Sequence, residues 1–314
     1  MKILVTGGFG YLGGRVAQSL DAQGHEVLLG SRTAMEPPSW LPRARIAQTD
    51  WNSLDRLREI CDGVAAVIHL AGMNAQDCAM DPSAALEVNA VATARLVRAA
   101  IEASVRRFVY ISTAHVYGEP LSGVITEDSC PFPRHPYATS HRAAEDVVRY
   151  FHNRKAIEGV VIRLSNAFGK PMRPEVNCWT LLVNDLCRQA VISRRMVLRS
   201  SGRQRRDFIP LSAVCRAVNH LVDLPVIELG DGVFNAGTGF APTVLDMTRR
   251  VADRVVCLAG YSPEVVPGSE DGEVAESLEY RVTKPMSTGF QGDGAADVDQ
   301  EIDGLIGFCF THCR

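Results

Sequence analysis

The chain lacks several features that mark specialised classes of protein. Among its 314 residues, no apolar run approaches the ~20 residues that a membrane-spanning helix needs. Lys and Arg total 33 against 36 Asp and Glu, and the formal net charge of −3 gives no global attraction to nucleic acid or to a membrane. Internal repeats and low-complexity tracts are absent. The opening residues MKILVTGG hold too short an apolar stretch for a signal peptide, so we expect a strand there.

Cysteine is present, but in no pattern that indicates pairing. The nine cysteines are odd in number and scattered: Cys61, Cys78, Cys130, Cys178, Cys187, Cys215, Cys257, Cys309 and Cys313. Reduced, buried thiols in a cytoplasmic protein are the simplest interpretation. The C-terminal stretch CFTHC (309–313) offers two thiols and one imidazole without a second pair of ligands, so we predict no metal site there.

The first half of the sequence alternates two kinds of segment. Short, almost wholly apolar stretches predict strands at residues 2–7, 26–32, 45–50, 64–72, 106–113 and 159–166. Segments with apolar residues at helical spacing lie between them, at residues 11–24, 54–63, 82–103 and 136–153. Apolar strands separated by helices indicate a parallel sheet covered on both faces. We therefore predict an α/β fold with a Rossmann-type, doubly wound parallel sheet.

The alternation breaks after residue 166. A loop-like stretch is followed by a helix at about 178–192, a strand at 195–200, a basic loop at 201–208, a helix at 210–224 and a strand at 233–239. From about residue 260 the chain is acidic, rich in glycine and only weakly periodic. We expect residues 1–166, with 207–237 returning to them, to form the sheet domain. Residues 167–206 and 238–314 are expected to form a smaller lobe.

The strongest local signal is the glycine-rich sequence VTGGFGYLGG near the N-terminus. Gly7, Gly10 and Gly13 lie between a predicted strand and a predicted helix. The first glycine permits a tight turn, the second a close approach of backbone to a pyrophosphate, and the third close packing of helix on strand. Tyr11 and Leu12 open the helix with Gly13, so their N–H groups face the anion. The sheet domain is therefore predicted to bind a dinucleotide.

The end of the second strand bears on the choice of dinucleotide. An acidic residue there would bond the ribose hydroxyls of NAD, whereas a cation accommodates the 2′-phosphate of NADP. This sequence has Ser31 and Arg32, which favours NADP and leaves NAD possible, since Arg32 is equally consistent with a solvated surface charge. Asp50 and Trp51 end the third strand and are placed to reach the adenine, although packing is the alternative for Trp51.

Six ordered motifs together resemble one family. They are TGGFGYLG, HLAG (69–72), YISTAHVYG (110–118), Tyr137 with its partner four residues on, RLSNAFG (163–169) and GRQRRDFI (202–209). The sequence resembles the extended short-chain dehydrogenases/reductases, in particular the NAD-dependent epimerase/dehydratase group that acts on nucleotide sugars. The resemblance implies further coenzyme contacts at Leu70, Ala71, Gly72, Asn89, Ser112, Tyr137 and His141. It implies a nucleotide-diphosphate sugar as substrate, with neither nucleic acid nor membrane as partner, and a homodimer through segments 82–103 and 136–153.

The resemblance assigns catalysis to a tyrosine and its neighbours. In such enzymes the tyrosine is the general acid/base, here Tyr137, and a Ser or Thr that ends the preceding strand shares its hydrogen bond, here Thr113. The family's lysine four residues later binds the nicotinamide ribose and lowers the pKa of the phenol, but this sequence has His141. An unperturbed imidazole is protonated only about a quarter of the time at pH 7. Either His141 substitutes for lysine or relays protons, or Tyr137 acts mainly as a neutral acid, or catalysis is lost.

A second departure bears on the reaction. Family dehydratases have Thr-Asp-Glu at the strand end, whereas this sequence has Thr113, Ala114 and His115. Without those two carboxylates we do not expect 4,6-dehydration, which leaves hydride transfer at sugar C4. Arg32, through NADPH, favours reduction of a 4-keto nucleotide sugar, and a 4-epimerase with retained NAD is the alternative. His115 is expected either to contact the sugar or to support Tyr137, with packing as the equal alternative.

On the substrate side, the resemblance implies contacts from the smaller lobe. Asn166 would reach the sugar or diphosphate, and Asn177 is expected to begin a helix whose N-terminus receives a phosphate. Arg206 matches the family's diphosphate-binding arginine, and a guanidinium suits a pyrophosphate because it bonds two oxygens at once. From a different class, a catalytically impaired dinucleotide-binding sensor stays open. Retention of Thr113, Tyr137 and Arg206 argues against it.

Overall fold

The computed structural model of the chain describes residues 1–269, 276–290 and 295–313. Seven parallel strands form the central sheet in the order β11-β7-β5-β4-β1-β2-β3. In chain order these are β1 (Lys2–Thr6), β2 (Glu26–Ser31), β3 (Arg45–Gln48), β4 (Ala66–His69), β5 (Arg107–Thr113), β7 (Glu158–Leu164) and β11 (Val233–Ala236). The strand order reverses direction between β1 and β4, where doubly wound sheets place their ligands. The predicted Rossmann-type parallel sheet is confirmed.

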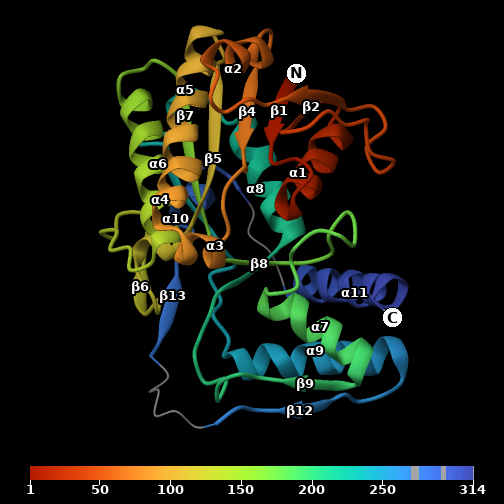
Figure 1. Cartoon of the computed structure of the whole chain (residues 1–314). Coiled ribbons are helices and arrows are strands. Elements are labelled where there is room, and N and C mark those ends of the chain that lie inside the picture. Colours follow the sequence, from red (N-terminus) through yellow and green to blue (C-terminus); the bar gives the residue numbers. More distant parts are fainter. Residues whose placement is uncertain (270–275, 291–294, 314) are drawn as a thin grey trace.

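Helices cover both faces of the sheet (Figure 1). One face carries α1 (Tyr11–Ala22) and α8 (Leu211–Asp223), and the other carries α2 (Leu54–Cys61), α5 (Ala92–Glu102) and α6 (Pro136–Asn153). The central strand β5 is buried along its whole length, which explains why its sequence has no polar–apolar alternation. Each face therefore has its own apolar core.

The helix predicted over residues 82–103 is interrupted. It consists of α4 (Pro82–Ala85), a π-helical segment η1 (Leu86–Val91) and α5, preceded by a separate short helix α3 (Ala75–Met80). The wider π turn carries Asn89, whose side chain is buried. Such π turns often occur at functional sites, and apolar periodicity gives no sign of them.

The second lobe lies beneath the sheet in Figure 1 and contains three helices with their own apolar core. These are α7 (Leu182–Ser193), α9 (Val244–Ala259) and α11 (Ala295–His312), beside the paired strands β9 (Arg195–Val197) and β12 (Glu264–Val266). Shorter elements are β8 (Asn166–Phe168), β10 (Phe208–Pro210), β6 (Gly123–Ile125), β13 (Leu278–Tyr280), α10 (Thr283–Ser287), η2 (Ala114–Tyr117) and η3 (Val226–Glu228). The sequence predicted neither α9 nor α11. Residues 270–275, 291–294 and 314 of the expected lobe lie outside the described residues.

Among the helices in the described ranges, none combines the length and the apolar character needed to cross a bilayer.

Glu301 of α11 ties the lobe to the sheet domain. Its carboxylate accepts two hydrogen bonds from Arg15 of α1, at 2.7 and 3.1 Å. It also accepts the backbone N–H groups of Lys170 and Ser212, at 3.2 and 3.0 Å. The Glu301 side chain is almost fully buried, so the four bonds offset the cost of removing its charge from water.

We expect Glu301→Ala to lower the free energy of unfolding by about 3 kcal/mol, because it leaves Arg15 partly buried without its counter-charge. Urea denaturation followed by circular dichroism measures the change. Asp303→Ala is the matched control on the same helix, since Asp303 pairs with Arg254 at a more exposed position and its loss should cost far less. Equal losses in the two variants would contradict the anchoring role of Glu301.

Candidate functional site

The glycine loop between β1 and α1 has the geometry of an anion site. Gly7 has a φ of +69°, and a Cβ on it would lie 2.8 Å from the backbone nitrogen of Ala71. A Cβ on Gly13 would lie 2.1 Å from the carbonyl oxygen of Gly7. No side chain caps α1 at Gly10, and the first turn holds no acidic residue. The opening N–H groups are therefore available to a pyrophosphate, and the loop fits a dinucleotide.

One positively charged side chain, Arg32, lies directly after β2, near the expected position of the adenosine ribose. Ser31 is buried, and its hydroxyl oxygen accepts the backbone N–H of Thr33 at 3.3 Å. Arg32 is exposed and, within the described part of the chain, forms no ion pair. Its guanidinium is thus open to a 2′-phosphate.

The predicted adenine contacts have partners of their own. Asp50 accepts the backbone N–H of Asn52 at 3.0 Å. The Trp51 ring lies 5.7 Å from the His69 ring, centroid to centroid, so packing accounts for part of its surface. Leu70 and Ala71, which follow β4, are half-buried, and Gly72 is exposed. Coenzyme contacts at these positions remain predictions.

Two predicted coenzyme contacts are occupied by other protein groups. The amide of Asn89 accepts the N–H of Met73 at 2.7 Å and donates to Ser140 Oγ at 2.9 Å. The hydroxyl of Ser112 donates to Glu145 Oε1 at 2.6 Å. Asn89 and Ser112 therefore position the backbone and the helix that surround the site, and coenzyme contacts at these two residues remain predictions.

A chain of hydrogen bonds runs through His69 at the end of β4. Its Nδ1 lies 2.6 Å from Thr6 Oγ1 and its Nε2 lies 2.9 Å from Thr93 Oγ1. Thr93 donates its own hydroxyl to the carbonyl of Asn89 at 2.5 Å, so it must accept from Nε2–H of His69. Burial lowers the pKa of His69 to about 3. This neutral histidine joins β1, β4 and the π turn.

Tyr137 lies in the first turn of α6. His135 caps this helix, accepting the N–H of Tyr137 on its Nδ1 at 3.1 Å. Burial raises the pKa of Tyr137 to about 12, which outweighs the lowering by a hydrogen bond with Thr113. The two adjacent hydroxyls have different neighbours: Thr113 opposes part of the rise in the pKa of Tyr137, and Ser112 donates to Glu145.

His141 lies one turn further along α6 and packs edge-on against Tyr137, with ring centroids 4.4 Å apart at 62°. Its Nδ1 lies 2.7 Å from the hydroxyl oxygen of Tyr110. Burial, reinforced by the nearby His115, lowers the pKa of His141 to about 3. An unperturbed imidazole would be protonated about a quarter of the time at pH 7, whereas His141 is buried without a counter-charge and is therefore held in its neutral form.

A buried ion pair holds α6 against the sheet. Glu145 on α6 accepts bonds from Arg163 of β7 at 2.7 to 3.2 Å and from Arg142 at 3.2 Å. Arg163 also donates to the Tyr117 hydroxyl at 2.8 Å. Together with Ser112, these contacts fix the rotation of the helix that carries Tyr137.

His115 does not continue strand β5. The strand ends at Thr113, and His115 lies in the 3₁₀ turn η2 with its backbone N–H donating to Thr113 Oγ1 at 3.2 Å. Its Nδ1 is buried and has no hydrogen-bond partner among the described residues. Burial lowers the pKa of His115; nearby Glu119 opposes the shift, and Arg206 and His135 add to it.

The remaining substrate-side predictions have mixed outcomes. Asn166 donates its side-chain amide to the carbonyl of Asp207 at 2.9 Å, and Arg206 is exposed and close enough to His115 to affect its pKa. The prediction that Asn177 begins a helix is wrong, because α7 begins at Leu182. Before it, Trp179 packs against the apolar core of the lobe and Cys178 is buried.

Sequence reasoning missed three residues around this site. Tyr110 stands two residues before Ser112, so strand alternation directs both to the α6 face, a signal that was available. Glu145 lies two turns after Tyr137, but nothing local reveals its partner on β7. Asp207 follows Arg206 and accepts bonds from Ser165, from the Thr238 N–H and hydroxyl, and from the Gly239 N–H; burial raises its pKa to about 6.

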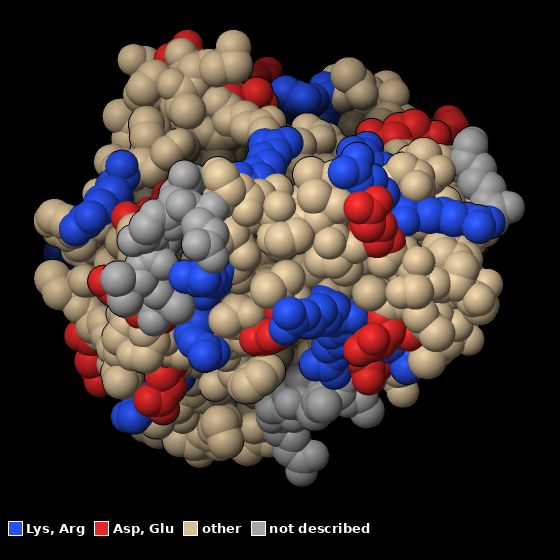
Figure 2. Space-filling model, turned by 90° about the horizontal axis from the view of Figure 1, so that it is seen from below, with Lys and Arg blue, Asp and Glu red and all other residues tan. Residues whose placement is uncertain are grey.

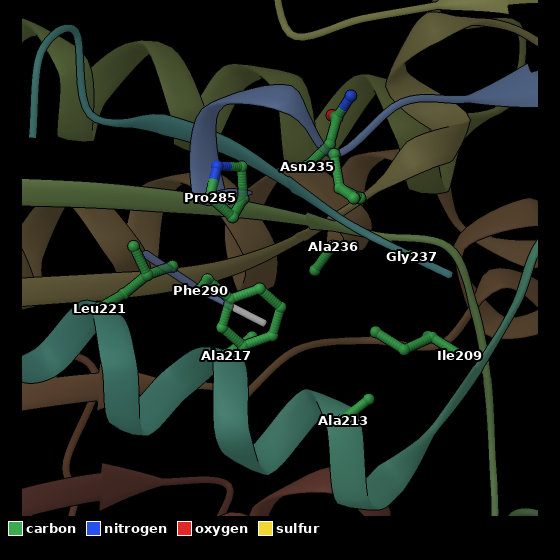
Figure 3. Close-up of a pocket in the computed structure, with 10 residues that line it drawn as sticks. Ile209, Ala213, Ala217, Leu221, Asn235, Ala236, Gly237, Pro285 and Phe290 are labelled. Carbon is green, nitrogen blue, oxygen red and sulfur yellow. The ribbon is translucent and has the colours of Figure 1, made fainter. Parts of the chain in front are cut away.

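A small cavity lies on the opposite side of the sheet from α6, between α8, β11 and α10 (Figure 3). Its volume of about 10 Å³ is room for roughly one water molecule. The lining is mostly apolar: Ile209, Ala213, Ala217, Leu221, Ala236, Gly237, Val282, Pro285 and Phe290. Asn235 turns its amide away from the cavity and bonds Tyr117 and Tyr280. This cavity is a packing gap rather than the ligand site.

The face seen in Figure 2 carries basic and acidic side chains interspersed with one another. Pairs such as Arg250–Asp299 and Arg254–Asp303 join α9 to α11 in this lobe. The homodimer expected through segments 82–103 and 136–153 stays a prediction; Leu86, Val88 and Val91 are exposed apolar residues there.

Comparison with known proteins supports the resemblance drawn from the motifs. Residues 3–237 match the NAD dependent epimerase/dehydratase family. The dTDP-D-glucose 4,6-dehydratase of Mus musculus is 28% identical over 262 residues, covering 80% of this chain and 72% of that protein. The UDP-glucose 4-epimerase of Rhizobium meliloti is 27% identical over 271 residues, covering 81% and 82%.

Solved structures give the same result for the fold. MoeE5 in complex with UDP-glucose and NAD superposes with a TM-score of 0.79 at 25% identity, over all of both chains. The UDP-glucose 4-epimerase of Thermotoga maritima, solved with UDP-glucose, superposes with a TM-score of 0.83 at 21% identity, again over both whole chains. The second likeness concerns the fold alone. Because the family match extends over well more than half of the sequence, this chain belongs to the NAD-dependent epimerase/dehydratase family.

Proposed function

We propose that the protein reduces a 4-keto nucleotide-diphosphate sugar, with Tyr137 giving the proton to the sugar C4 oxygen. One observation carries the proposal: the partly buried Tyr137 phenol lies beside Thr113 and a neutral His141, and desolvation raises its pKa to about 12. Such a phenol is a proton donor across the working pH range and a poor base. Only about one molecule in 100,000 is ionised at pH 7.

Each residue then has a role in the reduction. When bound, the nicotinamide coenzyme supplies a hydride to the carbonyl carbon of the sugar. Thr113 shares a hydrogen bond with Tyr137 and holds the carbonyl oxygen in reach of the phenol. Tyr137 transfers its O–H proton to that oxygen, which becomes the C4 hydroxyl, and the phenolate regains a proton from water.

The coenzyme of the proposal is NADP, with NAD possible. Exposed Arg32, directly after β2, forms no ion pair with the described residues and supports NADP, whereas the similar MoeE5 structure holds NAD. On the substrate side, Arg206 supports a diphosphate contact, with Asn166 and His115 beside the sugar. Arg206 is near enough to His115 to lower its pKa, which supports contacts of both residues with one ligand.

A 4-epimerase with retained NAD is the second candidate, favoured by the similarity to UDP-glucose 4-epimerases. An epimerase needs Tyr137 as a base in one half-reaction, which the raised pKa opposes. A 4,6-dehydratase would need two carboxylates after Thr113, where the chain has Ala114 and His115. A catalytically impaired sensor would not need to retain Thr113, Tyr137 or Arg206.

Two measurements test the proposal. Mass spectrometry identifies the nucleotide that acid releases from the purified protein, and an activity assay measures turnover of 4-keto nucleotide sugars. We expect no tightly held NAD, and net consumption of NADPH with UDP- or dTDP-linked 4-keto sugars. Tightly held NAD with interconversion of C4 epimers and no net coenzyme consumption would establish the epimerase instead. Bound dinucleotide without turnover of any such sugar would support the sensor.

The pH profile tests the role of Tyr137. We expect the rate of reduction to be flat from pH 6 to 8, because neither Tyr137 nor His141 titrates there, while the reverse oxidation rises about tenfold per pH unit with the phenolate fraction. Tyr137→Phe should lower kcat about 10²–10⁴-fold. Tyr150→Phe, at an exposed position on the same helix, is the control and should leave kcat unchanged. A reductive profile with an inflection near pH 6.5 would implicate a titrating histidine instead.

Arg32→Asp tests the coenzyme proposal. Loss of one charge-assisted contact to a 2′-phosphate should weaken NADP binding about 10- to 100-fold and leave NAD binding equal or stronger. Fluorescence titration of both reduced coenzymes measures the change. Arg249→Asp makes the same charge change at an exposed position in the lobe and controls for net charge. Unaltered NADP affinity in Arg32→Asp would contradict the assignment.

A further inference from the structure

A buried hydrogen bond behind the candidate site is not used by the proposed reaction. Tyr110 of β5 and His141 of α6 are 2% and 8% exposed, and the Tyr110 hydroxyl oxygen lies 2.7 Å from His141 Nδ1. Their ring centroids are 5.7 Å apart at 35°. The pair connects the sheet to the helix that carries Tyr137, one turn from it.

The direction of this hydrogen bond follows from the count of donors. A neutral imidazole has one N–H and one acceptor nitrogen. Within the described ranges, the Tyr110 hydroxyl has no partner except His141 Nδ1. If Nδ1 carried the proton, the phenolic hydrogen would be left buried without an acceptor, which is costly. The phenol therefore donates to Nδ1, and the proton of His141 resides on Nε2.

Among the described residues, no other donor or acceptor competes for the Tyr110–His141 hydrogen bond. His69 is the nearest other imidazole, 5.7 Å from the Tyr110 ring, but both of its nitrogens are engaged by Thr6 and Thr93. The other titratable groups that act on the pair are Tyr137, Glu145 and Cys78 on Tyr110, and His115 on His141. Glu145 is itself held by Ser112 and Arg163. Neutral His141 therefore has a single tautomer that satisfies every buried group.

The opposite ring nitrogen is free to act on a ligand. In the part of the chain that the structure describes, His141 Nε2 has no protein hydrogen-bond partner, although the ring packs against the proposed proton donor, Tyr137. An N–H group on Nε2 bonds an oxygen acceptor such as a hydroxyl of the coenzyme ribose. Unlike an ammonium group, it adds no positive charge that would acidify Tyr137.

We propose that Tyr110 is a positioning residue: its hydroxyl holds His141 in the Nε2–H tautomer, so that a neutral N–H donor faces the bound dinucleotide. The inference rests on the proposed function for the location of the dinucleotide. It assigns His141 a fixed, uncharged donor role in place of a relay that exchanges protons. Tyr110 acts only through His141 and touches neither coenzyme nor sugar.

Nitrogen-15 NMR of the ligand-free protein tests the tautomer directly, because long-range correlations distinguish the two ring nitrogens. We expect Nε2–H for His141 in the wild type and a mixture of tautomers in Tyr110→Phe, with NADPH binding weakened about tenfold. Absence of the His141 signals in His141→Leu assigns them. The His69 signals are an internal control, since Thr6 and Thr93 should keep that ring in the Nε2–H form and so report an intact fold.

Tyr261→Phe is the matched control, because it removes a hydroxyl that donates to the Ala190 carbonyl at 2.9 Å within the lobe. It should change neither the His141 tautomer nor NADPH affinity. A double-mutant cycle completes the test: if Tyr110 acts through His141, Tyr110→Phe should have no further effect on NADPH affinity in the His141→Leu background.

Three results would overturn the proposal: Nδ1–H in the wild type, an unchanged tautomer in Tyr110→Phe, or an altered tautomer with unchanged NADPH affinity. Full additivity in the cycle would do so as well. The tautomer is measured without substrate. A failure of the tautomer prediction is therefore distinguishable from a failure of the proposed reduction. If Tyr110→Phe does not fold, the wild-type tautomer and the affinity of His141→Leu, expected to fall about tenfold, decide the question.

Discussion

The arrangement of the site depends on one buried ion pair, between Glu145 of α6 and Arg163 of β7. Removing both charges from water is costly, and the pair is tolerated because Ser112, Arg142 and Tyr117 satisfy the remaining hydrogen-bonding capacity. Such a pair has one geometry that satisfies all of its partners. It therefore fixes the rotation of α6 about its axis and directs the face with Tyr137 and His141 toward the carboxyl ends of the strands.

The same burial keeps three titratable side chains of the site neutral. Tyr137, His141 and His69 all lie in the low-dielectric region between α6 and the sheet, and each is held in its neutral form. A lysine at position 141 would have brought a permanent cation into this region. With an imidazole there, the phenol keeps its proton more strongly, and the direction of proton transfer that the site favours is donation.

A feature of the fold or the site could be predicted from the sequence where neighbouring residues in the chain determine it, and not where residues distant in the sequence do. The sheet and the glycine loop follow from apolar runs and glycine spacing, and both are confirmed by the fold. The helix α11 was missed because Gly304 and Gly307 and an apolar surface on several sides obscure its periodicity. The neutral state of His141 was also missed, since the pKa of a side chain depends on its surroundings in the fold, here burial and, to a lesser extent, the nearby His115. The prediction that Asn177 begins a helix was wrong because the preceding loop, which contains two prolines, carries no signal that locates the start of α7.

The π turn at Leu86–Val91 constrains how the chain length can vary. It contains one residue more than a regular turn, so deletion of a residue there would give a more regular helix. Every residue on one side of the deletion would then be displaced by about 100° around the axis relative to the other side. Asn89 would lose its alignment with the Met73 N–H and the Ser140 hydroxyl at once. A locally more favourable backbone would thus disconnect α6 from the loop after β4, which makes this segment intolerant of length changes despite its exposed surface.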